Sequence, residues 1–140
     1  LVGSLIAAFI FQASGAASGT VGQLFAAAAE KKMTAPAINL VLKGLLCNTL
    51  VCIAVWCSIK LKSEAGKLIM IMWCILTFML CGFEHSIANM FYLPAGIFLG
   101  ANVGWGGFLL SNLLPVTLGN IVGGCLVGIV YRAVYLKKKG

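Results

Sequence analysis

Long apolar runs separated by short polar segments organise the chain of 140 residues. Ala37 to Ile59 carries one charge, Lys43, and Pro36 before it suits the first turn of a helix. A helix needs roughly 20 apolar residues to cross a hydrocarbon core of about 30 Å. This run therefore predicts a membrane-spanning helix whose Lys43 side chain extends toward the interface. Phe108 to Tyr135 predicts a second crossing, kinked at Pro115.

Between these two crossings lies an apolar stretch with a polar break at its centre. Leu68 to Cys81 and Met90 to Leu99 are each too short to cross a bilayer alone, and the segment Gly82 to Asn89 separates them. Together they predict one discontinuous spanning helix. Ala101 to Gly107, rich in glycine, predicts the outer turn that follows.

The N-terminal part of the chain predicts the end of another spanning helix. Leu1 to Ser14 is apolar from its first residue, with no initiator Met and no charged leader before it. We therefore expect the chain to be truncated at this end. Gly15 to Lys32 predicts a small-residue loop or a re-entrant element.

Composition requires a solvent other than water. Hydrophobic residues make up 61% of the chain and charged residues 9%, whereas soluble domains carry about 25% charged residues. This excludes a disordered segment and argues strongly against a soluble globular domain. An integral membrane protein is the prediction that remains.

The net charge of +7 reflects membrane topology and does not indicate nucleic acid. Most basic residues fall in the predicted loop 60–67 and in the C-terminal segment 132–139. The positive-inside rule places such segments in the cytoplasm, which leaves Lys31 and Lys32 on the outer side. No nucleic-acid partner is expected.

Cysteines and glycines both indicate packing. The six cysteines lie in apolar runs without a CxxC pair, so we expect buried thiols and neither a metal nor a cofactor. Glycines four residues apart predict close helix contacts. These pairs are Gly119 with Gly123, Gly124 with Gly128, and Gly15 with Gly19.

Glu84 and His85 are the candidates for function, because they are the acidic residue and the histidine at predicted membrane depth. Irregular backbone at that depth is tolerated only inside protein or beside a water-filled cavity. The break therefore predicts a pore centre; the alternative is a buried histidine that stabilises the break. Asn48 and Asn120, midway along neighbouring helices, could orient His85 or simply join two helices.

Three segments carry a family resemblance. Residues 46–56 (LCNTLVCIAVW), 83–90 (FEHSIANM) and 112–124 (NLLPVTLGNIVGG), in this order, closely resemble the formate/nitrite transporter family. The resemblance implies an all-α membrane protein: a pentamer of six-helix protomers, each an aquaporin-like inverted-repeat bundle with its own pore. It further implies that residues 1–140 form a single transmembrane domain beginning within the third helix.

Within that domain, the resemblance divides the chain between two repeats. Residues 1–32 would be the last helix of the first repeat plus the outer loop. Residues 33–140 would be the second three-helix repeat, with its broken helix at 82–89.

Carried over position by position, the resemblance also assigns site residues. His85 matches the central pore histidine, Phe78 the aromatic residue of the cytoplasmic constriction, and Glu84 an acidic residue that is more structural than permeating. By composition alone, Phe78 is expected to be a core residue and not a gate.

Three more positions match the family's polar residues. Asn48 and Lys32 match an asparagine and a lysine of the outer vestibule. Asn120 matches the asparagine that holds the central histidine.

The implied function is passage of small monovalent weak-acid anions, such as formate, nitrite, hydrosulfide or lactate, across the bacterial cytoplasmic membrane. A bare anion faces a large desolvation penalty in a narrow apolar pore. Lys31 and Lys32, with helix N-termini, could supply positive potential. His85 could protonate the anion or hydrogen-bond to it, because its pKa lies near physiological pH. Anions, protons, lipid and four further copies of the chain are the expected partners.

Other interpretations remain open. An aquaporin-like pore for neutral solutes lacks its Asn-Pro-Ala motifs here, since Met90 follows Asn89. A truncated chain could also be a fragment that does not conduct. An enzyme is not expected, because Glu84 and His85 point about 100° apart on a helix and no nucleophile or metal-ligand set accompanies them. The cysteines and the glycine-rich turn favour the hydrosulfide branch of the family.

Overall fold

The computed structural model describes residues 1–136, and these residues form helices joined by short loops, without a strand. The α-helices are α1 (Val2–Ala13), α2 (Thr20–Met33), α3 (Ala37–Lys60), α4 (Glu64–Leu80), α5 (Ser86–Phe98) and α6 (Leu114–Tyr131). Two π-helical segments, η1 (Gly107–Leu113) and η2 (Arg132–Leu136), flank α6. The predicted C-terminal basic cluster at Lys137, Lys138 and Lys139 lies outside the described residues.

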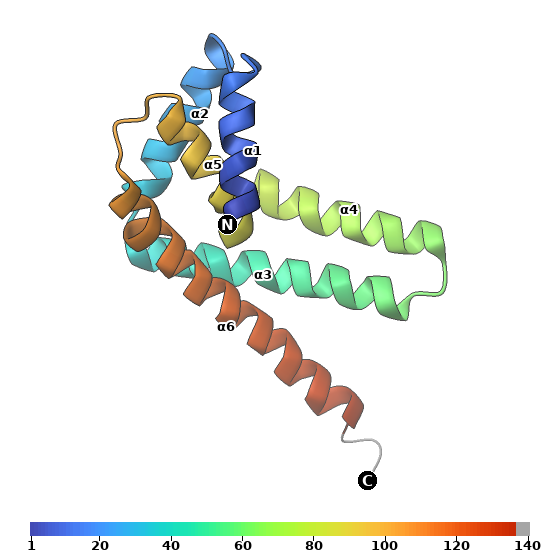
Figure 1. Cartoon of the computed structure of the whole chain (residues 1–140). Coiled ribbons are helices and arrows are strands. Elements are labelled where there is room, and N and C mark those ends of the chain that lie inside the picture. Colours follow the sequence, from blue (N-terminus) through green and yellow to red (C-terminus); the bar gives the residue numbers. More distant parts are fainter. Residues whose placement is uncertain (137–140) are drawn as a thin grey trace.

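Figure 1 shows α1, α2 and α5 gathered at one end of the molecule, while α3 and α4 extend side by side from it and α6 crosses α3. The long helices are those predicted from the sequence. Helix α3 has 24 residues, and the continuous helix Gly107–Tyr135 has 29; both are long and apolar enough to cross a membrane. Many large apolar side chains are exposed, among them Leu80, Ile59 and Leu110. Such a surface needs lipid or further protein to cover it.

Glycines allow α3 and α6 to pack backbone against backbone. A Cβ at Gly119 would collide with the backbone of Val41, and one at Gly123 with the backbone of Leu45. The predicted close packing at this glycine pair is confirmed. Without side chains at these positions, the two helices approach closely enough for dispersion contacts along their backbones.

The prediction for Gly15 and Gly19 is wrong. Both have positive φ values, 73° and 66°, and a Cβ at either would meet nothing within 4 Å. They form the turn between α1 and α2, where glycine adopts the left-handed conformation without strain. Their spacing therefore reflects a turn and not helix contact.

The segment Gly15 to Lys32, predicted as a loop or re-entrant element, is helical from Thr20 onward. Its run of alanines has high helix propensity, and Phe25 stacks on Tyr92 of α5 with ring centroids 4.4 Å apart. Ala29 and Met33 of α2 are buried in the core with Leu93 of α5. Tertiary packing thus turns a small-residue segment into an element of the core.

The loop predicted at 60–67 is also shorter than expected. Helix α4 begins at Glu64 because Ser63 caps it, its side chain accepting a hydrogen bond from the N–H of Gly66. Glu64 then pairs with Lys67 at 2.7 Å within the first turn. Only residues 61–63 separate α3 from α4.

The last crossing departs from α-helical geometry directly before Pro115. The N–H of Leu114 donates to the carbonyl of Leu109, five residues earlier, as in a π-helix. Pro115 lacks an N–H and follows this π-turn at the start of α6. A second proline, Pro94, lies inside α5.

Replacing Gly119 by Ala should destabilise the protein, because the new methyl group would collide with the backbone of Val41. Overpacking of this kind costs about 1–3 kcal/mol, so the thermal unfolding temperature in detergent should fall. Gly128→Ala is the matched control in the same helix, since a Cβ there meets no described atom within 4 Å. Equal losses in both variants would contradict close packing of α3 and α6.

Candidate functional site

The polar break begins with an orderly helix end. Gly82 has a φ of 64°, and its N–H donates to the carbonyl of Met79, while the N–H of Phe83 donates to the carbonyl of Phe78. These two bonds form a Schellman motif, which satisfies carbonyls that the end of α4 would otherwise leave unpaired. Glycine is required here because the left-handed conformation strains other residues.

The break ends earlier than predicted, because α5 begins at Ser86. The segment 82–89 was expected to be irregular throughout, yet Ser86 to Asn89 form the first turn of a helix. His85 is the N-cap residue: its Nδ1 accepts a hydrogen bond from the N–H of Ala88 at 3.3 Å. The non-helical residues are therefore 81–85.

Asn120 connects the break to the two long helices. Its Nδ2 donates to the carbonyl of Gly44 at 2.9 Å and to the carbonyl of Glu84 at 3.0 Å. Its Oδ1 accepts from the N–H of Ser86 at 2.9 Å. Asn120 thus binds the backbone on both sides of His85.

Asn48 supports the same arrangement from α3. Its Nδ2 donates to the backbone carbonyl of Asn120 at 2.6 Å. Among the described hydrogen bonds, neither asparagine contacts the imidazole of His85. Both side chains therefore join helices, which is one of the two roles expected from the sequence. Asn120 acts on His85 only indirectly, through the backbone of Glu84 and Ser86.

A closed ring of hydrogen bonds surrounds Glu84. Lys32 Nζ donates to Glu84 Oε1 at 2.8 Å, and Asn89 Nδ2 donates to Glu84 Oε2 at 2.7 Å. Asn89 Nδ2 also donates to Asn112 Oδ1 at 2.8 Å, and Asn112 Nδ2 donates to the carbonyl of Lys32 at 2.9 Å. The ring links α2, the break, α5 and η1, and it gives both carboxylate oxygens a donor.

The ring also changes what Lys32 can do. The Lys32 side chain is 25% exposed and that of Glu84 is 5% exposed, so the pair is largely removed from water. A cation paired at 2.8 Å contributes little net potential at a distance. Lys31, which is exposed, is the lysine of this segment whose charge has no carboxylate partner among the described residues.

Sequence reasoning missed the roles of Asn89 and Asn112, although both are buried. A weak signal existed, since Asn112 is an amide within the apolar run Phe108 to Tyr135 and Asn89 ends the polar break. Their importance depends on contacts 23 to 80 residues apart in the chain. Such contacts follow from the fold and cannot be read from local spacing.

The remaining predicted residues meet at a cavity. The rings of His85 and Phe78 are stacked with centroids 5.8 Å apart. Both line a cavity of about 250 Å³ whose other walls are mainly apolar residues of α3 and α4, including Val51, Val55 and Ile75. His85 therefore presents its imidazole to an apolar space with few other polar groups.

This geometry fixes the expected proton position on His85. A ring nitrogen that accepts a hydrogen bond carries no proton, so a neutral imidazole capping Ala88 through Nδ1 carries its proton on Nε2. The ring can then donate one hydrogen bond from Nε2. Among residues 1–136 no group of three or more metal-ligating side chains occurs, and the cysteines are free thiols.

A family model described as formate/nitrite transporter matches residues 1–134. The formate channel FocA of Escherichia coli (strain K12) is 34% identical over a 160-residue alignment that covers 99% of this chain and 56% of that protein. A probable formate transporter of Methanothermobacter thermautotrophicus is 52% identical over 93 residues, which are 66% of this chain and 34% of that protein.

A solved structure described as a pentameric formate channel with formate bound superposes with a TM-score of 0.84 at 35% identity. The superposition covers 96% of this chain and 61% of that one. It confirms the predicted all-helical, membrane-type fold. The chain spans about half the length of the curated relatives that it matches from end to end.

Replacing Glu84 by Gln should lower stability, because it leaves the partly buried ammonium of Lys32 without a negative partner. Removing the acceptor of a charged hydrogen bond costs about 1–3 kcal/mol, which thermal unfolding of the detergent-solubilised protein would detect. Combining it with Lys32→Met should recover part of the loss.

Glu64→Gln is the matched control for that variant. Its pair with Lys67 lies at the surface, where the Glu64 side chain is 82% exposed, and such pairs contribute about 0–1 kcal/mol. If Glu84→Gln is as stable as Glu64→Gln, the ring around Glu84 does not stabilise the fold.

Proposed function

The chain belongs to the formate/nitrite transporter family, and from this premise we propose that the protein conducts small monovalent weak-acid anions across a membrane. Formate, nitrite, hydrosulfide and lactate form the substrate class. The observation that carries the proposal is the position of His85: it lies at a helix break and lines an apolar cavity.

The electrostatics of the break favour an anion without holding it tightly. The Lys32–Glu84 pair cancels its own charge, whereas the N-terminus of α5 begins at the break and carries the positive end of a helix dipole. Lys31, exposed at the end of α2, adds positive charge at the predicted outer mouth. A weak positive potential lowers the desolvation barrier but still lets the anion leave.

His85 would then meet the anion as a hydrogen-bond donor. At neutral pH its Nε2–H can donate to an anion while Nδ1 keeps Ala88 capped. A second proton would have to bind at Nδ1, which adds positive charge and removes the acceptor of the Ala88 N–H. Acidification therefore strengthens attraction for the anion and loosens the first turn of α5.

Phe78 is proposed as the aromatic residue of the cytoplasmic constriction. Its ring stacks on His85 and lines the same cavity. An apolar ring beside the hydrogen-bonding site passes a neutral acid more easily than a desolvated anion. Transfer of a proton to the anion from the imidazolium form of His85, which returns to the neutral imidazole, would thus assist passage.

We place the protein as a homopentamer, which the pentameric formate channel of similar structure supports. We also propose that it lies in the bacterial cytoplasmic membrane with multiple crossings, and that residues 1–140 belong to one transmembrane domain. Membership of the hydrosulfide branch stays a prediction. Relatives in this family are channels or transporters, so no catalytic residue is assigned.

The test is anion flux into proteoliposomes between pH 5 and 8, comparing the native full-length protein with His85→Asn. Asparagine is a good helix N-cap but does not titrate, so the break should stay folded. Native flux of formate should change in slope within this pH range, in which histidine side chains titrate. In His85→Asn that change should be absent.

A comparison of His85→Phe with His85→Asn separates the effect of the cap on folding from the effect of titration. Phenylalanine removes both the titrating group and the cap, and loss of an N-cap costs about 1 kcal/mol, so this variant should also unfold at a lower temperature. Chloride serves as the anion that accepts no proton at these pH values. A native pH profile retained by His85→Asn would contradict a role for His85 in pH dependence, and no anion flux at all would remove the proposed function.

A further inference from the structure

A second cavity, separate from the one at the break, lies between α3 and α6. It has a volume of about 390 Å³ and is lined by apolar side chains from Leu45 to Trp56 on α3 and from Leu126 to Val130 on α6. Its one polar residue, Thr49, already donates its hydroxyl to the carbonyl of Leu45. We call this cavity the α3–α6 groove.

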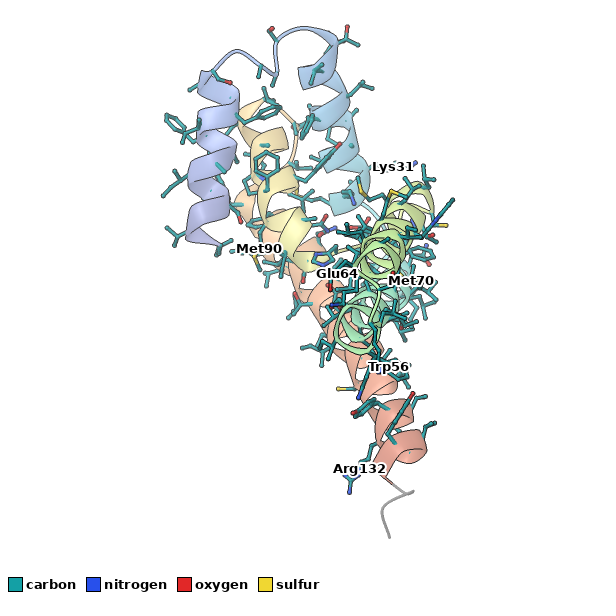
Figure 2. All side chains as sticks on the ribbon, turned by 90° about the vertical axis from the view of Figure 1, so that its right-hand side faces the viewer. Lys31, Trp56, Glu64, Met70, Met90 and Arg132 are labelled. Atoms are coloured by element: carbon teal, nitrogen blue, oxygen red, sulfur yellow. The ribbon has the colours of Figure 1, made fainter. Side chains whose placement is uncertain are left out.

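The groove ends at a cluster of aromatic rings. Trp56 meets Tyr131 and Tyr135 edge to face, each with centroids 5.6 Å away, and the two tyrosines stack at 5.1 Å. Figure 2 shows Trp56 toward the same end of the molecule as Arg132, which follows Tyr131 in the chain. Clusters of Trp and Tyr beside basic residues are typical of the membrane interface.

A cation lies over this cluster. Lys60 Nζ is 5.7 Å from the ring centroid of Tyr131 and 5.6 Å from that of Tyr135, within cation–π range. Trp56, Lys60 and Tyr135 also line a smaller pocket of about 190 Å³. Trp56 lines both the groove and this pocket, so the two spaces adjoin at its indole, and Lys60 lies beside the end of the apolar groove.

We infer that an anionic phospholipid binds here, with an acyl chain in the α3–α6 groove and its phosphate at Lys60. The occupant must be apolar along the groove and negative at the end, and a phospholipid of net negative charge combines both. Leu45 to Trp56 covers about 16 Å of helix, comparable with half of a hydrocarbon core of about 30 Å.

The polar groups at this end have no competing partner within the chain. Among residues 1–136, Lys60 forms no ion pair with a carboxylate. The buried indole Nε1–H of Trp56 finds no hydrogen-bond acceptor in the described part of the chain. An unpaired buried donor is costly, and a small movement of the Trp56 ring toward the pocket would let a phosphate or ester oxygen of a lipid headgroup accept from it.

An apolar face of a second protein copy is a weaker fit to these observations. It would fill the groove but offer no negative charge to Lys60. The reason is that the described part of the chain contains only three carboxylate side chains, Glu30, Glu64 and Glu84, and each already has a partner. Glu84 is buried in its own ring, and Glu64 pairs with Lys67. Glu30 accepts from the backbone of Asn102.

Quenching of Trp56 fluorescence by brominated lipid tests this inference. The full-length protein, with Trp56 as its sole tryptophan after changes that include Trp73→Phe and Trp105→Phe, is placed in nanodiscs that contain brominated phosphatidylglycerol or brominated phosphatidylcholine. Quenching by the anionic lipid should require a lower mole fraction, by roughly fivefold for one lysine near a membrane surface.

Substitutions distinguish a site from general attraction. Lys60→Gln should abolish the preference for the anionic lipid, and Lys60→Arg should keep it. Lys62→Gln is the matched control: Lys62 lies two residues away in the exposed loop and has the same effect on the net charge. It should leave the preference unchanged.

Three results would overturn the inference. Equal quenching by both lipids would mean that no anionic headgroup is selected. Equal effects of Lys60→Gln and Lys62→Gln would mean diffuse attraction to a charged surface. Absence of quenching by either lipid would mean that another subunit or segment covers the groove.

Discussion

A helix interrupted at membrane depth exposes backbone groups that lipid cannot satisfy, and the rest of this structure depends on how that cost is met. The end of α4 is closed by a Schellman motif at Gly82, and the start of α5 is capped by His85. Asn120 binds the carbonyl of Glu84 and the N–H of Ser86, which lie on either side of His85. The position of the imidazole is therefore set by the hydrogen bonds that make the break tolerable.

The buried charge at the break is compensated in the same way, by hydrogen bonds. A carboxylate at this depth would be prohibitive alone, so Glu84 receives donors on both oxygens from Lys32 and Asn89. Asn112, which the π-turn before Pro115 carries, closes the ring onto the backbone of Lys32. Because this support is neutral overall, the imidazole and the dipole of α5 are the main polar features near the cavity, which Ser58 also lines. Such a site can bind an anion and release it.

The sequence predicted those features of the fold that depend on residues close together in the chain. Apolar length identified α3 and the last crossing, and the pair Glu84 and His85 marked the break. The extent of the break was wrong because Ser86 and Asn89 are polar and resemble a loop, yet they lie three residues apart on one buried helix face. Their burial depends on Asn120 and Asn112, which are distant in sequence. For the same reason, the helix α2 and the compensated charge of Lys32 became evident only from contacts with α5 and Glu84.

The proposed role of His85 depends on a neutral imidazole that caps α5 through Nδ1 and presents its proton on Nε2. Solid-state nuclear magnetic resonance of the full-length protein in lipid, with ¹⁵N-labelled histidine assigned by a His85→Asn variant, measures this directly. At pH 7.5 we expect an unprotonated Nδ1 in a hydrogen bond and a protonated Nε2. A proton on Nδ1, whether from the other tautomer or from an imidazolium, would contradict it.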